Sequence, residues 1–117
     1  MRLRGLVTLK HRKEFVHVRS AGLSASCGGL VLQAVRAFSP SPDAIEVGFT
    51  VSKKSGNSVT RNKIRRRMRV AAQDILPERA NKDFCYVLVS SSRLADATLQ
   101  TLKSNLVVCL KRLRLHL

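Results

Sequence analysis

The sequence predicts an α+β domain in which helices pack against a small β-sheet. A period of two in the apolar residues over residues 45–51 indicates a strand, whereas spacings of three and four over residues 57–76 and 99–113 indicate helices. Hydrophobic residues make up 44% of the 117 positions, which is enough for a core. Because the chain has no internal repeat and no long linker, we expect one domain over residues 1–117.

The N-terminal third predicts a helix followed by a strand. We expect the helix over residues 8–20, with Thr8 as its N-cap and Gly22 as the residue that ends it. The segment over residues 29–38, which is rich in Val, Leu and Ala, predicts a strand. These assignments place a helix before the first strand that periodicity reveals.

The middle of the chain predicts a turn, a strand and a long helix. Two prolines and short polar side chains over residues 39–43 indicate the turn. The strand at residues 45–51 alternates apolar and polar side chains, so one of its faces is expected to be buried. A helix then runs from about residue 57 to Leu76, and Pro77 is expected to stop it.

The C-terminal part predicts a buried strand and an amphipathic helix. Residues 84–90 have strand length and are apolar up to the final serine, as in a fully buried strand. Leucines at three- and four-residue steps over residues 99–113 indicate a helix with one apolar face, and Thr98 can cap its start. The element order is helix, two or three strands, helix, strand, helix.

Charge limits the classes of partner. The chain has 22 Lys and Arg residues against 7 Asp and Glu residues, which gives a formal net charge of +15. Charges of one sign repel each other within the folded chain, so we expect a polyanionic partner that neutralises them. A membrane is the weaker choice, because no apolar run approaches the roughly 20 residues that span a bilayer. Residues 1–7 lack the apolar stretch of a signal peptide, so we expect a cytoplasmic protein.

The strongest local signal is a cationic segment without acids. Residues 53–69 contain eight Lys and Arg residues, and no acidic residue occurs between Glu46 and Asp74. On a helical wheel an apolar stripe from Ile64 to Ile75 faces inward. The residues expected on the outer face, or at its border in the case of Arg61, are Arg61, Asn62, Lys63, Arg65, Arg66, Arg67 and Arg69. Arginine pairs bidentately with phosphate and stacks on bases, so this face favours structured RNA.

Alternatives to this interpretation stay open. The charged face could be merely solvated, although an ordinary solvated face mixes both signs to form pairs along the helix. A structural RNA-binding protein such as a ribosomal protein, or a membrane-active cationic protein, would share the composition. No phosphate-binding glycine loop, paired carboxylates or close Cys/His pairs occur, so we expect no catalytic residue and no metal site in the protein. The three cysteines are expected to be free thiols.

Two adjoining motifs resemble the bacterial ribonuclease P protein family. That family carries the pattern R-N-x-x-[KR]-R-x-x-R, and this chain matches it at every fixed position. The matching residues are Arg61, Asn62, Arg65, Arg66 and Arg69. The preceding run from Val47 to Lys54, which reads VGFTVSKK, also matches the family. The likeness extends more loosely over nearly the whole chain.

The resemblance implies a fold and a role. The fold would be a single-domain α-β-β-β-α-β-α sandwich with a left-handed βαβ crossover, ribosomal protein S5 domain 2-like, with a short first strand near residues 25–27. The basic helix would dock on the catalytic RNA of ribonuclease P, and a cleft beside the first helix would receive the single-stranded 5′ leader of precursor tRNA. Hydrolysis with Mg²⁺ would belong to the RNA subunit. No obligatory protein partner is implied.

The resemblance also suggests further RNA- or leader-binding positions, and near some of them this chain departs from the family. The expected residues are Phe15, Arg19, Gln33, Phe49, Ser52, Lys53, Lys54 and Arg93. The family often has aromatic residues at the positions of Arg19 and Gln33, and many members have a basic pair where residues 90–92 are serines. The cleft is therefore expected to be less aromatic and more polar, and leader binding to depend more on charge.

Overall fold

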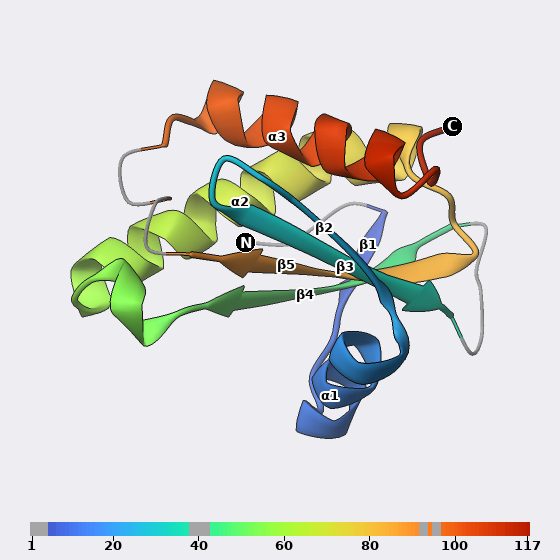
Figure 1. Cartoon of the computed structure of the whole chain (residues 1–117), viewed down its shortest axis with the longest axis horizontal. Helices are drawn as coiled ribbons and strands as arrows, with labels where there is room; N and C mark the ends of the chain where they lie inside the picture. Colours follow the sequence, from blue (N-terminus) through green and yellow to red (C-terminus); the bar gives the residue numbers. More distant parts are fainter. Residues whose placement is uncertain (1–4, 38–42, 92–93, 95–96) are drawn as a thin grey trace.

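The computed structural model describes residues 5–37, 43–91, 94 and 97–117 (Figure 1). Its helices and strands confirm the predicted α+β class. In chain order they are β1 (Leu6–Thr8), α1 (Arg12–Ala21), β2 (Leu23–Cys27), β3 (Leu30–Arg36), β4 (Ile45–Val51), α2 (Ser58–Arg79), β5 (Phe84–Ser90) and α3 (Leu99–Arg112). A single 3-10 turn, η1 (Lys53–Ser55), connects β4 to α2.

The strands form one mixed sheet in the order β1-β4-β5-β3-β2. β1, β4 and β5 are parallel, and β3 and β2 continue the sheet as antiparallel neighbours. β4 and β5 are adjacent although α2 separates them in sequence, so β4, α2 and β5 form a β-α-β unit. This unit places the basic helix directly after a central strand.

The helices lie on both faces of the sheet. α2 and α3 lie side by side over one face, and α1 lies against the other (Figure 1). The main core fills the space between the sheet and the α2–α3 layer. Ile64 and Met68 of α2 meet Leu106 of α3 and the strand residues Leu32 and Tyr86, each no more than 1% exposed. Burial of this stripe fixes which side of α2 faces outward.

A second, smaller core holds α1 on the opposite face. It consists of Leu9, Val18, Cys85 and Val87, with Phe15 packed at its edge. β5 serves both cores, because its successive side chains point to opposite faces of the sheet.

Gly48 of β4 lies directly beneath the Phe15 ring. A β-carbon at Gly48 would lie 2.4 Å from Cε1 and 2.7 Å from Cζ of Phe15. Any larger residue would therefore have to displace the ring, so the glycine allows α1 to approach the sheet closely.

The start of α1 differs from its sequence prediction. Thr8 is not its N-cap, because residues 6–8 form β1 and pair with β4. His11 is the N-cap, and its backbone N–H donates to Glu14 Oε1 at 3.3 Å within a capping box. A three-residue edge strand carries no periodic signal of its own, which is why the sequence did not reveal β1. Gly22 ends the helix as predicted.

The end of α2 also differs, because the helix continues through Pro77 to Arg79. Proline has no N–H for the helical ladder and its ring crowds the preceding turn, but Pro77 lies in the last turn and later residues can still donate. The N–H of Ala80 donates to the carbonyl of Leu76 at 3.0 Å and closes the last turn.

The other predicted elements are present. β4, β5 and α3 are confirmed, Thr98 caps α3 as predicted, and β2 includes the short strand expected near residues 25–27. Most of the turn predicted at residues 39–43 lies outside the described residues. No described helix is long and apolar enough to cross a bilayer.

Candidate nucleic-acid interface

The connection from β4 to α2 positions the first two lysines of the cationic segment. Ser52 Oγ accepts a hydrogen bond from the Lys54 N–H at 3.2 Å and caps η1. Ser55 is buried, and its Oγ lies 3.2 Å from Oγ of Ser90 at the end of β5. The turn is thus fixed to the sheet, while Lys53 and Lys54 remain exposed.

Asn57 begins α2 as a side-chain cap. Its Oδ1 accepts the N–H of Thr60 at 2.9 Å, which satisfies one of the free donors at the helix start. The basic helix, predicted to run from about residue 57, therefore begins directly after Asn57.

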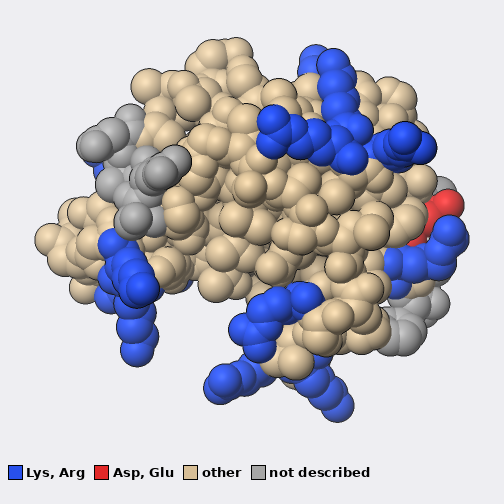
Figure 2. Space-filling model, in the orientation of Figure 1, with Lys and Arg blue, Asp and Glu red and all other residues tan. Residues whose placement is uncertain are grey.

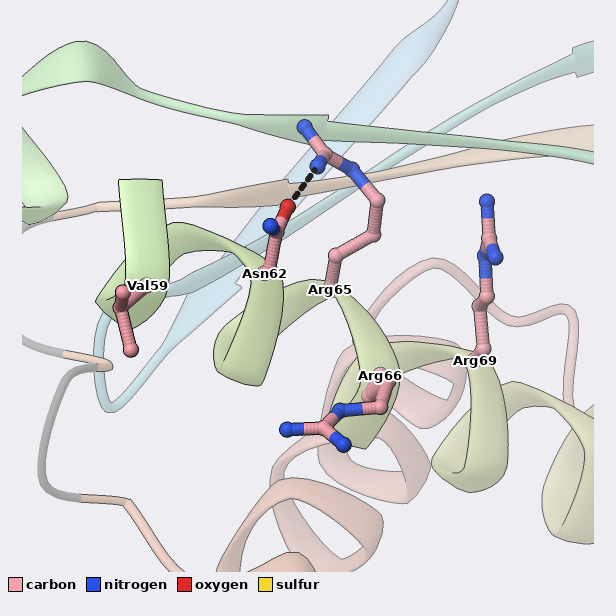
Figure 3. Close-up of a pocket in the computed structure, with 5 residues that line it drawn as sticks. All are labelled: Val59, Asn62, Arg65, Arg66 and Arg69. Atoms are coloured by element: carbon pink, nitrogen blue, oxygen red, sulfur yellow. Dashed lines mark hydrogen bonds between the residues drawn. The ribbon is translucent and has the colours of Figure 1, made fainter. Parts of the chain in front are cut away.

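Five residues of α2 form a surface that we call the arginine face: Val59, Asn62, Arg65, Arg66 and Arg69. They line an open hollow of about 510 Å³ (Figure 3). Asn62 Oδ1 accepts a hydrogen bond from Arg65 Nη1 at 3.1 Å. Arg69 extends in the same direction as Arg65, whereas Arg66 points away from these two (Figure 3).

The other predicted residues of α2 lie around this face or are turned away from it. Lys63 is exposed. Arg61 is only partly exposed, and its Nε is buried without a hydrogen-bond partner. Arg67 Nη1 donates to the carbonyl of Ala97 at 2.8 Å, so its guanidinium is directed toward the segment before α3. Arg67 therefore helps to join α2 to that segment, a contact that a helical wheel does not show.

Phe49 lies beneath the arginine face. The Arg69 guanidinium carbon is 6.0 Å from the centroid of the Phe49 ring, within the range of a cation–π contact. Phe49 packs against the main core and therefore lies on the α2 side of the sheet, away from α1.

No carboxylate neutralises these arginines within the described part of the chain. The ion pair found there, between Lys103 Nζ and Asp74 Oδ2 at 2.6 Å, joins α3 to the second half of α2. The arginine face thus carries positive charge without a carboxylate partner, exposed at Arg66 and partly exposed at Arg65 and Arg69. An anionic partner would find donors that are already exposed and partly ordered.

A second hollow lies between α1 and the sheet, and we call it the α1 groove. Its volume is about 250 Å³. Three of the predicted residues, Phe15, Arg19 and Gln33, lie together in it. The sequence did not single out the remaining lining residues, which are Arg12, Val16, Thr50, Val87 and Val89. Strand alternation places Val87 and Val89 on the α1 side, but nothing in the sequence shows that α1 covers that side.

The predicted residues therefore fall into separate groups. Ser52, Lys53 and Lys54 belong to the η1 turn rather than to the α1 groove. Arg93 lies outside the described residues. In the described ranges no cluster of three or more His, Cys, Asp or Glu residues is arranged to hold a metal ion.

The cysteines are free thiols, as predicted. Burial raises the pKa of Cys109 to about 11, and burial followed by the nearby Glu46 charge raises the pKa of Cys85. Both thiols belong to the cores rather than to the interface.

Comparison with known proteins connects this geometry to a family. The family model for ribonuclease P matches residues 3–114. The ribonuclease P protein component of Paramagnetospirillum magneticum is 38% identical over 106 residues, which cover 89% of this chain and 80% of that protein. The corresponding protein of Streptococcus thermophilus is 34% identical over 108 residues, which cover 92% and 93% of the two chains.

Solved structures share the fold. The ribonuclease P protein of Staphylococcus aureus superposes with a TM-score of 0.78 at 22% identity, covering 92% of this chain and 95% of that one. The ribonuclease P protein of Thermotoga maritima gives 0.76 at 22% identity, covering 91% and 96%. Because the family model matches residues 3–114, almost the whole of this chain, the chain belongs to the ribonuclease P protein family.

Proposed function

We propose that this protein binds the catalytic RNA of ribonuclease P through the arginine face and receives the 5′ leader of precursor tRNA in the α1 groove. In this role it assists removal of the leader in the cytoplasm, and the RNA carries out Mg²⁺-dependent phosphodiester hydrolysis. No further protein is required as a partner.

The observation that carries the proposal is the positive charge of the arginine face, which is at least partly exposed and which no carboxylate of the described residues neutralises. Asn62 and Arg65 are already hydrogen-bonded to each other, so the orientation of the Arg65 guanidinium is partly fixed before RNA arrives. The Asn62 amide nitrogen still offers donors to a ribose or base oxygen. Arginines that bind phosphates release counterions from the RNA, which makes the affinity strongly dependent on salt.

The α1 groove has the features expected for a short single strand. Phe15 offers one aromatic ring, and stacking of a base on such a ring contributes about 1–3 kcal/mol. Arg12 and Arg19 line the same hollow and supply positive charge for the leader phosphates. Gln33 and Thr50 add hydrogen-bonding groups. The groove thus combines limited stacking with charge.

The net charge of +15 suggests a second contribution. Catalytic RNA and precursor tRNA repel each other, and a cationic protein between them lowers that repulsion. The protein would therefore reduce the Mg²⁺ concentration that cleavage requires.

The direct test is cleavage of precursor tRNA by the catalytic RNA of the same genome across a Mg²⁺ titration, with and without the protein. We expect the protein alone to be inactive and to shift the half-maximal Mg²⁺ concentration downward. Equal cleavage with and without protein at every Mg²⁺ concentration would rule out the proposal.

The leader site is tested separately with precursor tRNA and mature tRNA as competing ligands of the holoenzyme. Phe15→Ala is expected to reduce the preference for the precursor, because it removes a stacking platform worth about 1–3 kcal/mol. An unchanged preference would remove Phe15 from the leader site.

A further inference from the structure

A third basic region lies at the C-terminal ends of α2 and α3. In Figure 2, Lys and Arg side chains gather over the C-terminal end of α3, at the upper right of the molecule. Backbone hydrogen bonds connect the ends of the two helices. The Asn81 N–H donates to the Leu115 carbonyl and the Leu117 N–H to the Arg79 carbonyl, both at 2.8 Å. The residues that follow α3 are thus hydrogen-bonded to the end of α2.

We name this region the C-terminal basic surface and define it by Arg79, Lys111, Arg112 and Arg114, all of which are exposed. Arg112 Nη1 donates to the carbonyl of Ser26 on β2. Within the described residues none of the four forms an ion pair with a carboxylate. Four exposed positive charges therefore lie near the place where two helices end, and the exposed Glu78 adjoins Arg79.

Arg114 has a backbone conformation that favours glycine. Its φ is +60°, and every other residue with positive φ among the described residues is a glycine. The Leu115 N–H donates to the Leu110 carbonyl at 2.9 Å, and this hydrogen bond between residues five apart is typical of a Schellman motif. Glycine is the usual residue at this position because it has no β-carbon to strain. An arginine here places a cation beyond the helix end at a cost in backbone energy.

The helix dipole does not account for the whole arrangement. Cations in the last turn stabilise a helix through its dipole, which suffices for Arg79, Lys111 and Arg112. Arg114 lies just beyond the last turn, where the dipole stabilises a cation less and glycine would avoid the backbone strain. A bound anion would offset the strain at this position.

The region is distinct from the arginine face. From Asn62 to Arg79 the axis of α2 advances by roughly 25 Å at 1.5 Å per residue. None of the four residues is aromatic, so the surface offers no platform for stacked single-stranded bases. Charges spread over two helix ends suit the backbone of a double helix, which proteins recognise through shape and phosphates.

We infer that the C-terminal basic surface is a second phosphate-binding site, which holds the backbone of an RNA double helix in the same complex as the arginine face. The inference rests on the proposed RNA-binding function. The two surfaces would contact RNA segments about 25 Å apart and so fix the orientation of the protein on its partner.

Arg114→Gly provides the decisive variant, because it removes the charge and relieves the backbone strain together. We expect the melting temperature to rise by roughly 3–6 °C. We expect affinity for the catalytic RNA to fall about three- to tenfold at 150 mM salt, and the slope of log affinity against log salt to fall by roughly 0.7–0.9.

Two controls accompany it. Arg114→Lys keeps the charge and the strained backbone, and should retain affinity. Lys13→Gln removes one exposed charge from α1, on the opposite face of the sheet, and should change affinity less than Arg114→Gly. A 20-base-pair RNA duplex and anionic phospholipid vesicles serve as additional probes of the wild-type chain and Arg114→Gly.

The outcomes separate this inference from the proposed function. If Arg65→Ala/Arg66→Ala weakens binding to the catalytic RNA and Arg114→Gly does not, only the second surface is wrong. If the arginine-face double variant also binds normally, the proposed function fails with it. Weakened binding of Arg114→Gly to vesicles, with unchanged binding to both RNAs, would also overturn the inference.

Discussion

The arginine face and the α1 groove are carried by helices on opposite faces of one sheet, and they are built in different ways. α2 lies on the main core through a continuous stripe that includes Ile64 and Met68, and its cations project from the opposite side of the same helix. α1 lies on a small core of four buried residues, and its groove combines side chains from one helix and three strands.

This difference shows how local and non-local sequence information produce a binding surface. One helix contains both the buried stripe and the charges of the arginine face, so a single periodic pattern specifies the surface. The α1 groove exists only after α1 has docked on the sheet. Its shape depends on close approach at Gly48, where the Phe15 ring leaves no room for a side chain.

The largest expected effect compares the two cores. Met68→Ala should reduce the free energy of unfolding by about 2–5 kcal/mol, because Met68 is fully buried in the main core. Val18→Ala, in the smaller core, should reduce the free energy of unfolding by about 1–2.5 kcal/mol. Urea unfolding of both variants measures the difference, and a larger loss for Val18→Ala would reverse the assignment of main and minor core.

The next effect concerns the packing beneath the α1 groove. Gly48→Ala should cost about 1–3 kcal/mol of stability, because the new β-carbon overlaps the Phe15 ring. In a Phe15→Ala background the same substitution should cost much less, since the overlapping atoms are gone. A double-mutant cycle measures this coupling. Equal costs in both backgrounds would show that Phe15 does not lie against Gly48.

A smaller effect tests the arginine face without changing its shape. Asn62→Asp keeps an oxygen that can accept from Arg65 but adds a negative charge to the surface. We expect the salt slope of binding to catalytic RNA to fall by roughly 0.7–0.9 for each phosphate that the protein no longer binds. Asn62→Ala, which adds no charge, should have a smaller effect. Filter binding at several salt concentrations measures both, and equal effects would exclude an electrostatic role of this position.

The smallest effect uses the cysteines as reporters of the two cores. Cys85 of β5 is 8% exposed in the small core beneath α1, whereas Cys109 of α3 is 0% exposed in the main core. At pH 8 iodoacetamide should label the partly exposed Cys27 first, then Cys85, and Cys109 last, as peptide mass spectrometry would show. Labelling of Cys109 before Cys85 would mean that the main core opens first.

The raised pKa of Cys109 also gives a dependence on pH. A thiol with a folded-state pKa of about 11 against an ordinary value of 9.0 stays neutral in the folded state where the unfolded chain ionises. Its contribution to stability is complete below pH 9 and disappears as the pH rises toward 11. Cys109→Ala should therefore show a shallower alkaline decrease of stability in urea unfolding, and an identical pH profile would contradict this.

Sequence reasoning was most successful where the spacing of apolar residues within one segment shows which of its faces is buried. The spacing from Ile64 to Ile75 predicted the buried side of α2, and burial in the structure confirms it. The alternation in β4 and the leucine spacing in α3 were equally reliable, because each pattern reports directly on a buried face.

The errors occurred where a distant partner decides the outcome. Thr8 belongs to β1 because β4 is available to pair with it, and no local pattern shows this. Arg67 was expected on the outer face, but the Ala97 carbonyl draws its guanidinium toward α3. Thr50 and Val89 line the α1 groove only because α1 covers that side of the sheet. Such arrangements depend on tertiary packing rather than on periodicity.

The most direct test of the arginine face is the salt dependence of binding to the catalytic RNA. Arg65→Ala/Arg66→Ala should lower the slope of log affinity against log salt by roughly 1.4–1.8, the change expected when two phosphates are no longer bound. Phe15→Ala, in the α1 groove, should leave this slope unchanged when no leader is present. An unchanged slope in the double variant would contradict the account.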